Sequence, residues 1–269
     1  MTFRDEAGRA TSAFVPPGAP GPGLPLFLVP ALGLDGRSFA PLAPLAARRR
    51  VVFWSPPNDL PRTAGFDGLA AAAFEHADRA GMPRRFVLGG SSLGAMVAMA
   101  AALAAPERIA GLVLSGGTAA WRDLGWPMRL ARCLHPLMPR RGYHRWMAKV
   151  LVPMTGMRTE QDIRLALDLR AQIEHRTREY ASSVIAATVG AGAFDLRPRL
   201  ASLRVPTIVL HARRDRVAPF AAAQSLAKAT GAAIVAFDGG SHLPYISRTA
   251  EFLAALEPFL ARLDQGATP

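Results

Sequence analysis

Six short and largely apolar segments recur along this chain, and helix-like stretches separate most of them. A strand that is covered on both faces of a parallel sheet reads as a continuous apolar run rather than as an alternation. We therefore interpret these segments as the strands of a buried, mostly parallel sheet. They lie at residues 26–29, 51–54, 85–89, 109–114, 206–211 and 232–237.

The stretches between the strands indicate how the sheet is covered. Strands that alternate with helices are typical of a doubly wound α/β sheet. A chain of 269 residues is long enough to bury a large core of this kind. The predicted helices lie at residues 65–80, 93–104, 219–229 and 249–263.

The alternation stops between about residues 118 and 195, where no strand-like run occurs. Prolines divide the first half of this span, and Leu165, Leu169 and Ile173 mark one apolar face of a longer helix. An all-helical insertion of this size between two strands is typical of a lid. We therefore predict a core formed by residues 1–117 and 196–269, with a helical cap at residues 118–195.

The first 25 residues differ in character from the rest of the core. They end in a segment rich in proline and glycine at residues 16–25. Such a composition is typical of turns and stiff linkers. We interpret this region as a linker or turn region rather than as a pair of strands.

The composition argues against several classes of protein. Half of the residues are hydrophobic and 19% are charged, unlike in a disordered chain. No apolar run approaches the roughly 18–20 residues of a transmembrane helix, and no apolar signal-peptide stretch follows Met1. The single cysteine, Cys133, excludes an internal disulfide and a cysteine-cluster metal site. We expect a soluble, cytoplasmic protein.

The segment most informative about chemistry follows the third predicted strand. Residues 90–94 read Gly-Ser-Ser-Leu-Gly and fit the pattern G-x-S-x-G between a strand and a helix. In this context the central serine, Ser92, is a candidate nucleophile on a tight turn, and the Leu93 amide lies beside any developing oxyanion. Ser91 does not fit the pattern, because it has no glycine two residues later.

A serine hydroxyl needs a base to remove its proton, and histidine is the usual base. His242 lies in a glycine-containing loop between the last strand and the last helix, where it can reach the same sheet edge as Ser92. We therefore predict His242 as the base. For His211, at the end of a strand, packing or a hydrogen bond to a loop is the better interpretation. The remaining histidines are assigned to packing or to the surface: His76, His135, His144 and His175.

The base in turn needs an orienting carboxylate, and Asp215 is our candidate. It follows the strand at 206–211 and precedes His242 by 27 residues. Asp195 precedes a strand and should therefore lie at the opposite edge of the sheet, whereas Asp238 can simply cap a turn. The structural alternative for Asp215 is an ion pair with a neighbouring arginine of its loop: Arg213, Arg214 or Arg216.

The order Ser92, Asp215, His242 in these contexts resembles the α/β-hydrolase superfamily of serine hydrolases over nearly the whole chain. The resemblance implies an α/β-hydrolase fold, with a mostly parallel doubly wound sheet and a helical cap inserted after the sixth strand. It also implies that residues 28–36 form the loop that carries a second oxyanion donor, the Leu32 amide, beside Leu93. Pro30 and Ala31 stand where the family usually has His-Gly.

The predicted cap concentrates positive charge. The chain has a net charge of +12, and residues 121–180 hold 12 basic and six acidic residues. A solvated outer face explains this pattern, and so does a surface that recruits an acidic carrier protein or another anionic interface. Residues 241–252 also resemble the histidine loop of pimeloyl-carrier-protein methyl ester esterases, which implies a carrier-bound substrate.

These observations favour a carboxylic ester hydrolase of the esterase or lipase kind, which acts through an acyl-enzyme on apolar or medium-chain acyl esters. An acyltransferase on the same residues is the alternative, and a non-catalytic binding protein is a third. The expected partner is a small-molecule ester. The chemistry requires neither a metal nor an organic cofactor, and no nucleic-acid-binding motif occurs.

Overall fold

The computed structural model describes residues 2–4, 10–16, 21–58, 65–126, 128–130, 194–239 and 242–266, together with the single positions 167, 171 and 184. Most of the predicted cap, including its arginine cluster, its apolar helix face, Cys133 and three of the histidines, lies outside these residues. The boundaries of the cap therefore stay a prediction.

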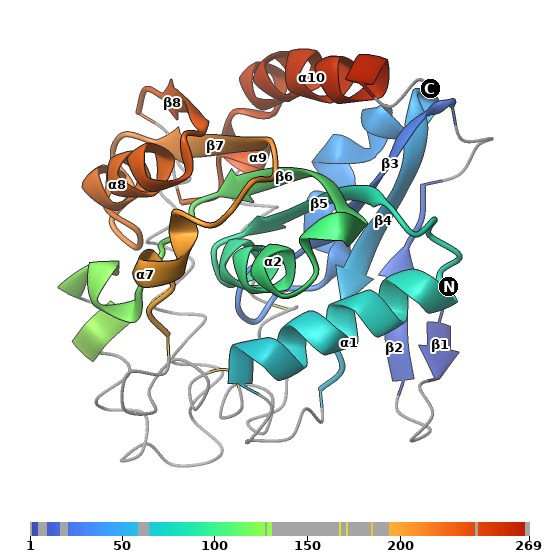
Figure 1. The fold of residues 1–269 in the computed structure, drawn as a ribbon, viewed down its shortest axis with the longest axis horizontal. Helices are drawn as coiled ribbons and strands as arrows, with labels where there is room; N and C mark the ends of the chain where they lie inside the picture. Colours follow the sequence, from blue (N-terminus) through green and yellow to red (C-terminus); the bar gives the residue numbers. More distant parts are fainter. Residues whose placement is uncertain are drawn as a thin grey trace.

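An eight-stranded sheet forms the centre of the molecule, in the order β1-β2-β4-β3-β5-β6-β7-β8 (Figure 1). The six strands from β4 to β8 in this order run parallel, as predicted. Their bounds lie within three residues of the predicted segments. They are β3 (Gly23–Val29), β4 (Arg49–Ser55), β5 (Phe86–Ser91), β6 (Ile109–Ser115), β7 (Thr207–Ala212) and β8 (Ala233–Phe237).

The interpretation of the first 25 residues as a linker is wrong. They contain β1 (Thr2–Arg4) and β2 (Ala10–Phe14), which pair with each other in antiparallel fashion. Strand β2 also pairs antiparallel to β4, with Ala13 opposite Trp54. The reason is that β4 otherwise has an open edge, whose backbone groups need partners, and short strands can supply them without a continuous apolar run.

Helices cover both faces of the sheet, and the strand residues alternate between two apolar clusters. Phe27 and Val29 pack on one face under α1, α2 and α8, whereas Leu26 and Leu28 pack on the other under η1, α9 and α10. This two-sided burial explains why the strands are apolar throughout. The helices are α1 (Gly65–Arg79), α2 (Leu93–Ala104), α7 (Arg197–Leu200), α8 (Phe220–Thr230), α9 (Pro244–Ser247) and α10 (Thr249–Gly266), with 3-10 segments η1 (Gly36–Ala47), η2 (Pro106–Arg108) and η3 (Trp121–Asp123).

Two further details differ from the sequence-based expectation. Strand β8 lies at the edge of the sheet, and its first residues Ala233 and Ile234 are exposed rather than covered on both faces. The 12-residue segment η1 was not predicted, since Pro41 and Pro44 interrupt an ordinary helical pattern. Among the described residues, no helix is both long enough and apolar enough to cross a membrane.

His76 is a buried histidine of α1. Its ring lies 6.1 Å from the rings of both Phe27 and Trp54, measured between centroids. Burial in these apolar surroundings, helped by the positive charge of Arg79, lowers the pKa of His76 from 6.5 to about 4. The folded protein therefore keeps this imidazole neutral at mildly acidic pH.

We expect His76 to make the protein sensitive to acid. Because the folded-state pKa is depressed, the unfolded chain binds a proton first as the pH falls below about 6.5, and stability is lost from there down to about pH 4. In His76→Phe, the loss between pH 7 and pH 4.5 should be smaller by about 2–3 kcal/mol. Urea unfolding at several pH values measures this difference. An unchanged pH dependence in the variant would contradict the assignment.

Candidate active site

The four segments singled out by the sequence meet at one edge of the sheet. Val29, Ser91, Ala212 and Phe237 end strands β3, β5, β7 and β8. Because these strands run parallel, the loops that follow them lie at the same carboxyl edge. Those loops carry, in order, Leu32, Ser92, Asp215 and His242.

Ser92 occupies the turn between β5 and α2 and has a strained backbone. Its dihedral angles are φ 54° and ψ −113°, and it is the only non-glycine residue with a positive φ in the part of the chain that the structure describes. The strain persists because neighbouring contacts hold the turn: the Ser92 N–H donates to Ser115 O at 2.7 Å, and Ser92 O accepts from the amides of Ala95 and Met96. Such strained positions cluster at functional sites.

Gly94 allows the β3 loop to approach this turn closely. A Cβ atom at position 94 would lie 1.9 Å from Val29 O and 2.8 Å from Pro30 O. No side chain fits there, so the second glycine of the G-x-S-x-G pattern is required by the contact between α2 and the end of β3. The contact brings residues 29–32 against the first turn of α2.

The amides of Leu32 and Leu93 meet the first requirement for oxyanion donors. Leu93 is the first residue of α2, so its N–H has no partner within the helix. Leu32 lies in a turn closed by a hydrogen bond from Leu34 N to Ala31 O at 3.0 Å. Neither amide donates a hydrogen bond to any acceptor among the described residues. Both are therefore available to a ligand oxygen.

His242 and Asp215 form a buried pair. His242 Nδ1 lies 2.8 Å from Asp215 Oδ2, and the two side chains are 7% and 1% exposed. The other carboxylate oxygen, Oδ1, accepts the backbone N–H groups of Val217 at 2.8 Å and Ala218 at 2.9 Å. This arrangement turns Oδ2 toward the imidazole and leaves the carboxylate little freedom to rotate.

The carboxyl group of Asp215 is ionised in spite of its burial. Burial alone raises the pKa of this group, but the neighbouring His242, the hydrogen bond to it, His211 and the Ala218 amide together hold the pKa below its usual value. A charged carboxylate accepts the Nδ1–H of His242 and leaves Nε2 as the basic nitrogen of that ring. This is the tautomer that a general base requires.

The imidazole of His242 is also in contact with the loop that follows β6. A Cβ atom at Gly116 would lie 2.9 Å from His242 O and 3.2 Å from His242 Cε1, and Gly116 has a φ of 61°. Gly116 directly follows Ser115, whose carbonyl accepts the Ser92 N–H. Ser92 and His242 therefore both lie against the same short stretch of chain.

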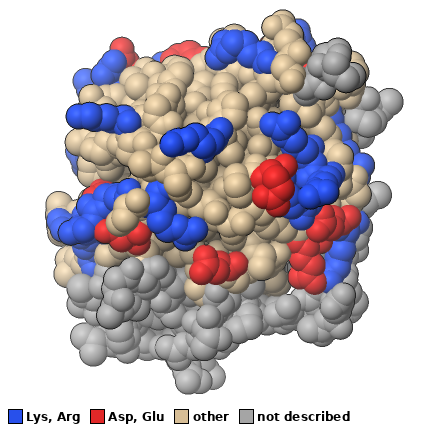
Figure 2. Space-filling model, viewed as in Figure 1, with Lys and Arg blue, Asp and Glu red and all other residues tan. Residues whose placement is uncertain are grey.

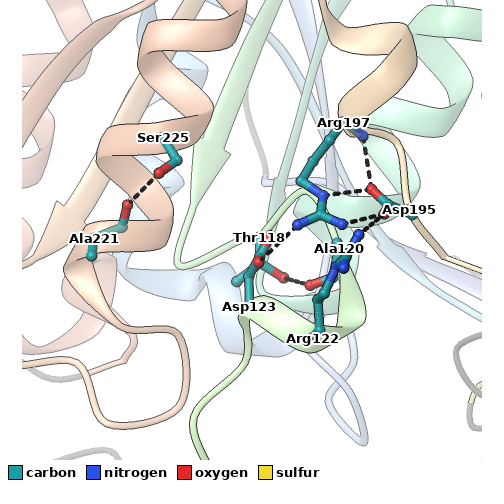
Figure 3. Close-up of polar contacts among 8 residues, drawn as sticks. All are labelled: Thr118, Ala120, Arg122, Asp123, Asp195, Arg197, Ala221 and Ser225. Carbon is teal, nitrogen blue, oxygen red and sulfur yellow. Dashed lines mark hydrogen bonds and ion pairs between the residues drawn. The ribbon is translucent and has the colours of Figure 1, made fainter.

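The rival carboxylates have other partners. The Asp238 side chain is 90% exposed and pairs with Arg213 at 2.9 Å. The argument against Asp195 from its place in the sequence was wrong, because Asp195 forms a β-bridge with Ala120, just beyond the carboxyl end of β6. The Asp195 carboxylate instead accepts hydrogen bonds from two arginines, Arg122 and Arg197 (Figure 3).

His211 behaves partly as predicted. Its Nε2 lies 2.8 Å from Ala218 O, which is the predicted hydrogen bond to a loop. The sequence did not indicate that the same nitrogen also lies 3.3 Å from Asp215 Oδ2. The spacing of four residues between His211 and Asp215 was the only signal in the sequence that they could meet. It was not sufficient, because β7 ends between the two residues and the turn after the strand brings their side chains together.

The segment that begins the predicted cap packs against the loop of Asp215. Leu124 and Met128 form a small apolar cluster with Val217 and Ala218. The Gly125 N–H donates to Val217 O at 2.8 Å. The start of this segment therefore holds the loop whose amides bind the Asp215 carboxylate.

The charges of the described surface are mixed. On the face shown in Figure 2, acidic side chains lie beside basic ones at several places, and uncharged surface separates the groups. Ion pairs account for part of this pattern, such as Arg108 with Asp78 on α1. The arginine-rich part of the predicted cap lies outside the described residues. Within the described part of the chain, no three His, Cys, Asp or Glu residues form a group that could hold a metal ion.

Sequence comparisons relate the chain to hydrolytic enzymes. The model of a family described as "Alpha/beta hydrolase family" matches residues 26–256. A protein of Rhizobium rhizogenes named as the carbamate hydrolase RutD is 29% identical over 84% of this chain and 88% of its own length. A pimeloyl-[acyl-carrier protein] methyl ester esterase of Nitrosomonas europaea is 27% identical over 75% of this chain and 81% of its own.

Solved structures share the fold over almost the full length. An esterase of Thermogutta terrifontis superposes with a TM-score of 0.82 at 21% identity, covering 98% of this chain and 99% of its own. The enol-lactonase of Burkholderia xenovorans gives a TM-score of 0.81 at 23% identity, covering 94% of this chain and 97% of its own. At these identities the likeness concerns the fold alone.

Proposed function

This chain belongs to the alpha/beta hydrolase family, and from that premise we propose that it is a serine-dependent carboxylic ester hydrolase. The proposal assigns Ser92 as nucleophile, His242 as general base and acid, Asp215 as the orienting carboxylate, and the amides of Leu32 and Leu93 as the oxyanion hole. The observation that carries it is the buried contact of 2.8 Å between His242 Nδ1 and Asp215 Oδ2, at the sheet edge where Ser92 takes its strained turn.

In the acylation half of the proposed reaction, Ser92 Oγ attacks the carbonyl carbon of the ester while its proton passes to His242 Nε2. The carbonyl oxygen becomes an oxyanion, and the two amides stabilise it. The imidazolium is stabilised by the Asp215 carboxylate, which stays ionised. His242 then gives the proton to the alcohol oxygen, the ester C–O bond breaks, and an acyl-serine remains.

In the deacylation half, water takes the place of the departed alcohol. His242 Nε2 removes a proton from the water, whose oxygen attacks the acyl carbon and forms a second oxyanion in the same hole. The proton returns to Ser92 Oγ as the acyl–serine bond breaks, and the carboxylic acid leaves. An alcohol in place of water would make the same machinery an acyltransferase.

For the acyl group we propose an apolar or medium-length chain. The names of several relatives favour a second candidate, an acyl ester that is carried by an acyl carrier protein. The 12 basic residues between positions 121 and 180 supply the charge that an acidic carrier would meet. The two candidates share every chemical step and differ only in what is attached to the acyl chain.

The test is hydrolysis of p-nitrophenyl esters with acyl chains of two to sixteen carbons, alongside one methyl ester offered both free and bound to an acyl carrier protein. We expect turnover with an optimum at one chain length, because a site of fixed size accommodates acyl chains only up to a certain length. A rate on the carrier-bound ester that greatly exceeds the rate on the free one would favour the second candidate.

The control in every assay is Ser92→Ala at equal concentration. Turnover that survives this substitution would show that the activity does not use the proposed nucleophile. A folded wild-type protein that hydrolyses none of these esters would contradict the proposed function.

A further inference from the structure

His211 is a second imidazole on the proposed catalytic carboxylate. It is the second-last residue of β7, and its side chain is fully buried. One of its nitrogens, Nε2, lies 2.8 Å from Ala218 O and 3.3 Å from Asp215 Oδ2. The same Oδ2 accepts from His242 Nδ1 at 2.8 Å. Two histidines therefore face one carboxylate oxygen.

The surroundings of His211 determine where its hydrogen is. A carbonyl oxygen can only accept, so the Nε2 beside Ala218 O carries the hydrogen. The other nitrogen, Nδ1, is buried and has no hydrogen-bond partner among the described residues. A second hydrogen there would be an unpaired buried donor, which is costly. His211 is thus held neutral, and burial lowers its pKa in agreement with this.

Asp215 therefore accepts three hydrogen bonds, and a fourth N–H group, that of His211, lies beside the carboxylate while it donates to Ala218 O. Oδ1 accepts the amides of Val217 and Ala218, and Oδ2 faces the ring N–H groups of His242 and His211. Ala218 takes part twice, because its N–H binds Oδ1 while its carbonyl accepts from His211. The acid loop and the neutral imidazole therefore hold each other in place.

We propose that His211 is a positioning residue that sets the proton affinity of His242 by holding a neutral N–H group beside Oδ2 of Asp215. The inference rests on the proposed function. The hydrogen on His211 Nε2 is the positive end of an N–H dipole, and at 3.3 Å from Oδ2 this dipole offsets part of the negative charge that the carboxylate presents to His242. With His211 in place, Asp215 stabilises the His242 imidazolium less, and the imidazole stays an unprotonated base to lower pH.

Other charged groups near the pair cannot produce the same dependence between pH 5 and 9. The arginines of the acid loop are exposed, and the hydroxyl of Tyr245 on α9 is buried with its pKa raised to about 12. Arginine and aspartate side chains keep one charge state across this range. In the described part of the chain, the charged or titratable groups on the elements around the pair are Arg213, Arg214 and Arg216 of the loop, Asp238 after β8, Arg122 and Asp123 of η3, and Tyr245.

The test compares His211→Phe with His211→Gln and the wild type by NMR of the histidine ring nitrogens between pH 5 and 9. Phenylalanine keeps a ring but has no donor. Glutamine carries an amide nitrogen the same number of bonds from Cα as Nε2, and so keeps the donor. In the wild type we expect His211 to stay neutral with its hydrogen on Nε2, while His242 titrates.

In His211→Phe, the midpoint of the His242 titration should rise by about half a unit. A full charge in contact shifts a pKa by roughly one to three units, and a neutral N–H supplies only a fraction of a charge. His211→Gln should keep the wild-type midpoint. In the ester assay, kcat/KM of the Phe variant should fall about threefold below the midpoint and recover at pH 9, since half a unit corresponds to that factor.

Each arm has an outcome that overturns the inference. A His211 that titrates together with His242, or that carries its hydrogen on Nδ1, would overturn it from the wild-type spectra alone, even if the Phe variant does not fold. An unchanged or lowered midpoint of the His242 titration in a folded His211→Phe variant would also overturn the inference. So would a loss of kcat/KM in that variant that is equal at every pH. The spectra can be measured without any turnover. If the protein shows no Ser92-dependent hydrolysis, the proposed function is refuted, but the spectra still test the inference about His211.

Discussion

Replacing Ser92 with alanine is expected to lower kcat for ester hydrolysis by about 10⁶-fold, the size of effect seen when a serine hydrolase loses its nucleophile. The substitution removes only one oxygen atom, at a residue whose backbone already has a φ of 54°. The Ser92 N–H bond to Ser115 O and the start of α2 do not involve the lost hydroxyl. The fold should therefore survive while the chemistry does not.

Two variants separate loss of the nucleophile from loss of structure. Ser91→Ala removes a neighbouring buried hydroxyl, which lies beside the Tyr245 hydroxyl and takes no part in the proposed chemistry, and it should keep wild-type turnover. Ser92→Gly should be as inactive as Ser92→Ala but more stable than it, because glycine adopts this backbone conformation without strain. Purified proteins, progress curves and thermal unfolding provide the measurements. Equal losses in Ser91→Ala and Ser92→Ala would count against the assignment.

Replacing Asp215 with asparagine should lower kcat by about 10⁴-fold, as in the precedent of serine proteases. The two backbone amides on Oδ1 require an acceptor there, so the asparagine must place its carbonyl oxygen at that position. Its NH2 group then takes the place of Oδ2 and faces His242 Nδ1. Nδ1 becomes the acceptor, the hydrogen moves to Nε2, and the imidazole can no longer accept the proton of Ser92.

The rival carboxylates provide matched controls for this substitution. Asp238→Asn should behave like the wild type, because the Asp238 side chain is exposed and its ion pair is with the exposed Arg213. Asp195→Asn weakens the ion pairs to Arg122 and Arg197 and should change stability more than the rate of the chemical step. Steady-state kinetics over pH 6 to 9 distinguish these effects. Near-normal turnover in Asp215→Asn would require a different acid.

Much of the fold was predictable because its strands are covered on both faces. Leu26 to Val29 are all apolar, since Leu26 and Leu28 meet one apolar cluster while Phe27 and Val29 meet the other. A run of this kind is readable without any knowledge of its neighbours. The pair β1 and β2 carries no such signal, because its role is to satisfy the backbone groups of β4, and pairing through the backbone leaves little trace in side chains.

The turn at Ser92 was readable for a similar reason. The glycines of the G-x-S-x-G pattern reflect close contacts of the backbone, and at Gly94 the contact is with Val29 O, 65 residues earlier. The strained backbone of Ser92 and the two unbonded amides follow from that local geometry. Local pattern thus indicated the candidate nucleophile, whereas the choice of His242 and Asp215 as its candidate partners rested on their places after the strands.

By itself, then, the sequence determined the parallel sheet, its alternation with helices and the turn that presents Ser92, because each of these depends on side chains near in the chain. Only the tertiary structure decided which groups from separate loops meet. Three contacts are of that kind: the ion pairs of Asp195 with two arginines, the approach of Gly116 to His242, and the approach of His211 to the carboxylate oxygen that binds His242. Their distances depend on how separate loops pack at one edge of the sheet, and packing at that edge leaves no periodic pattern in the chain.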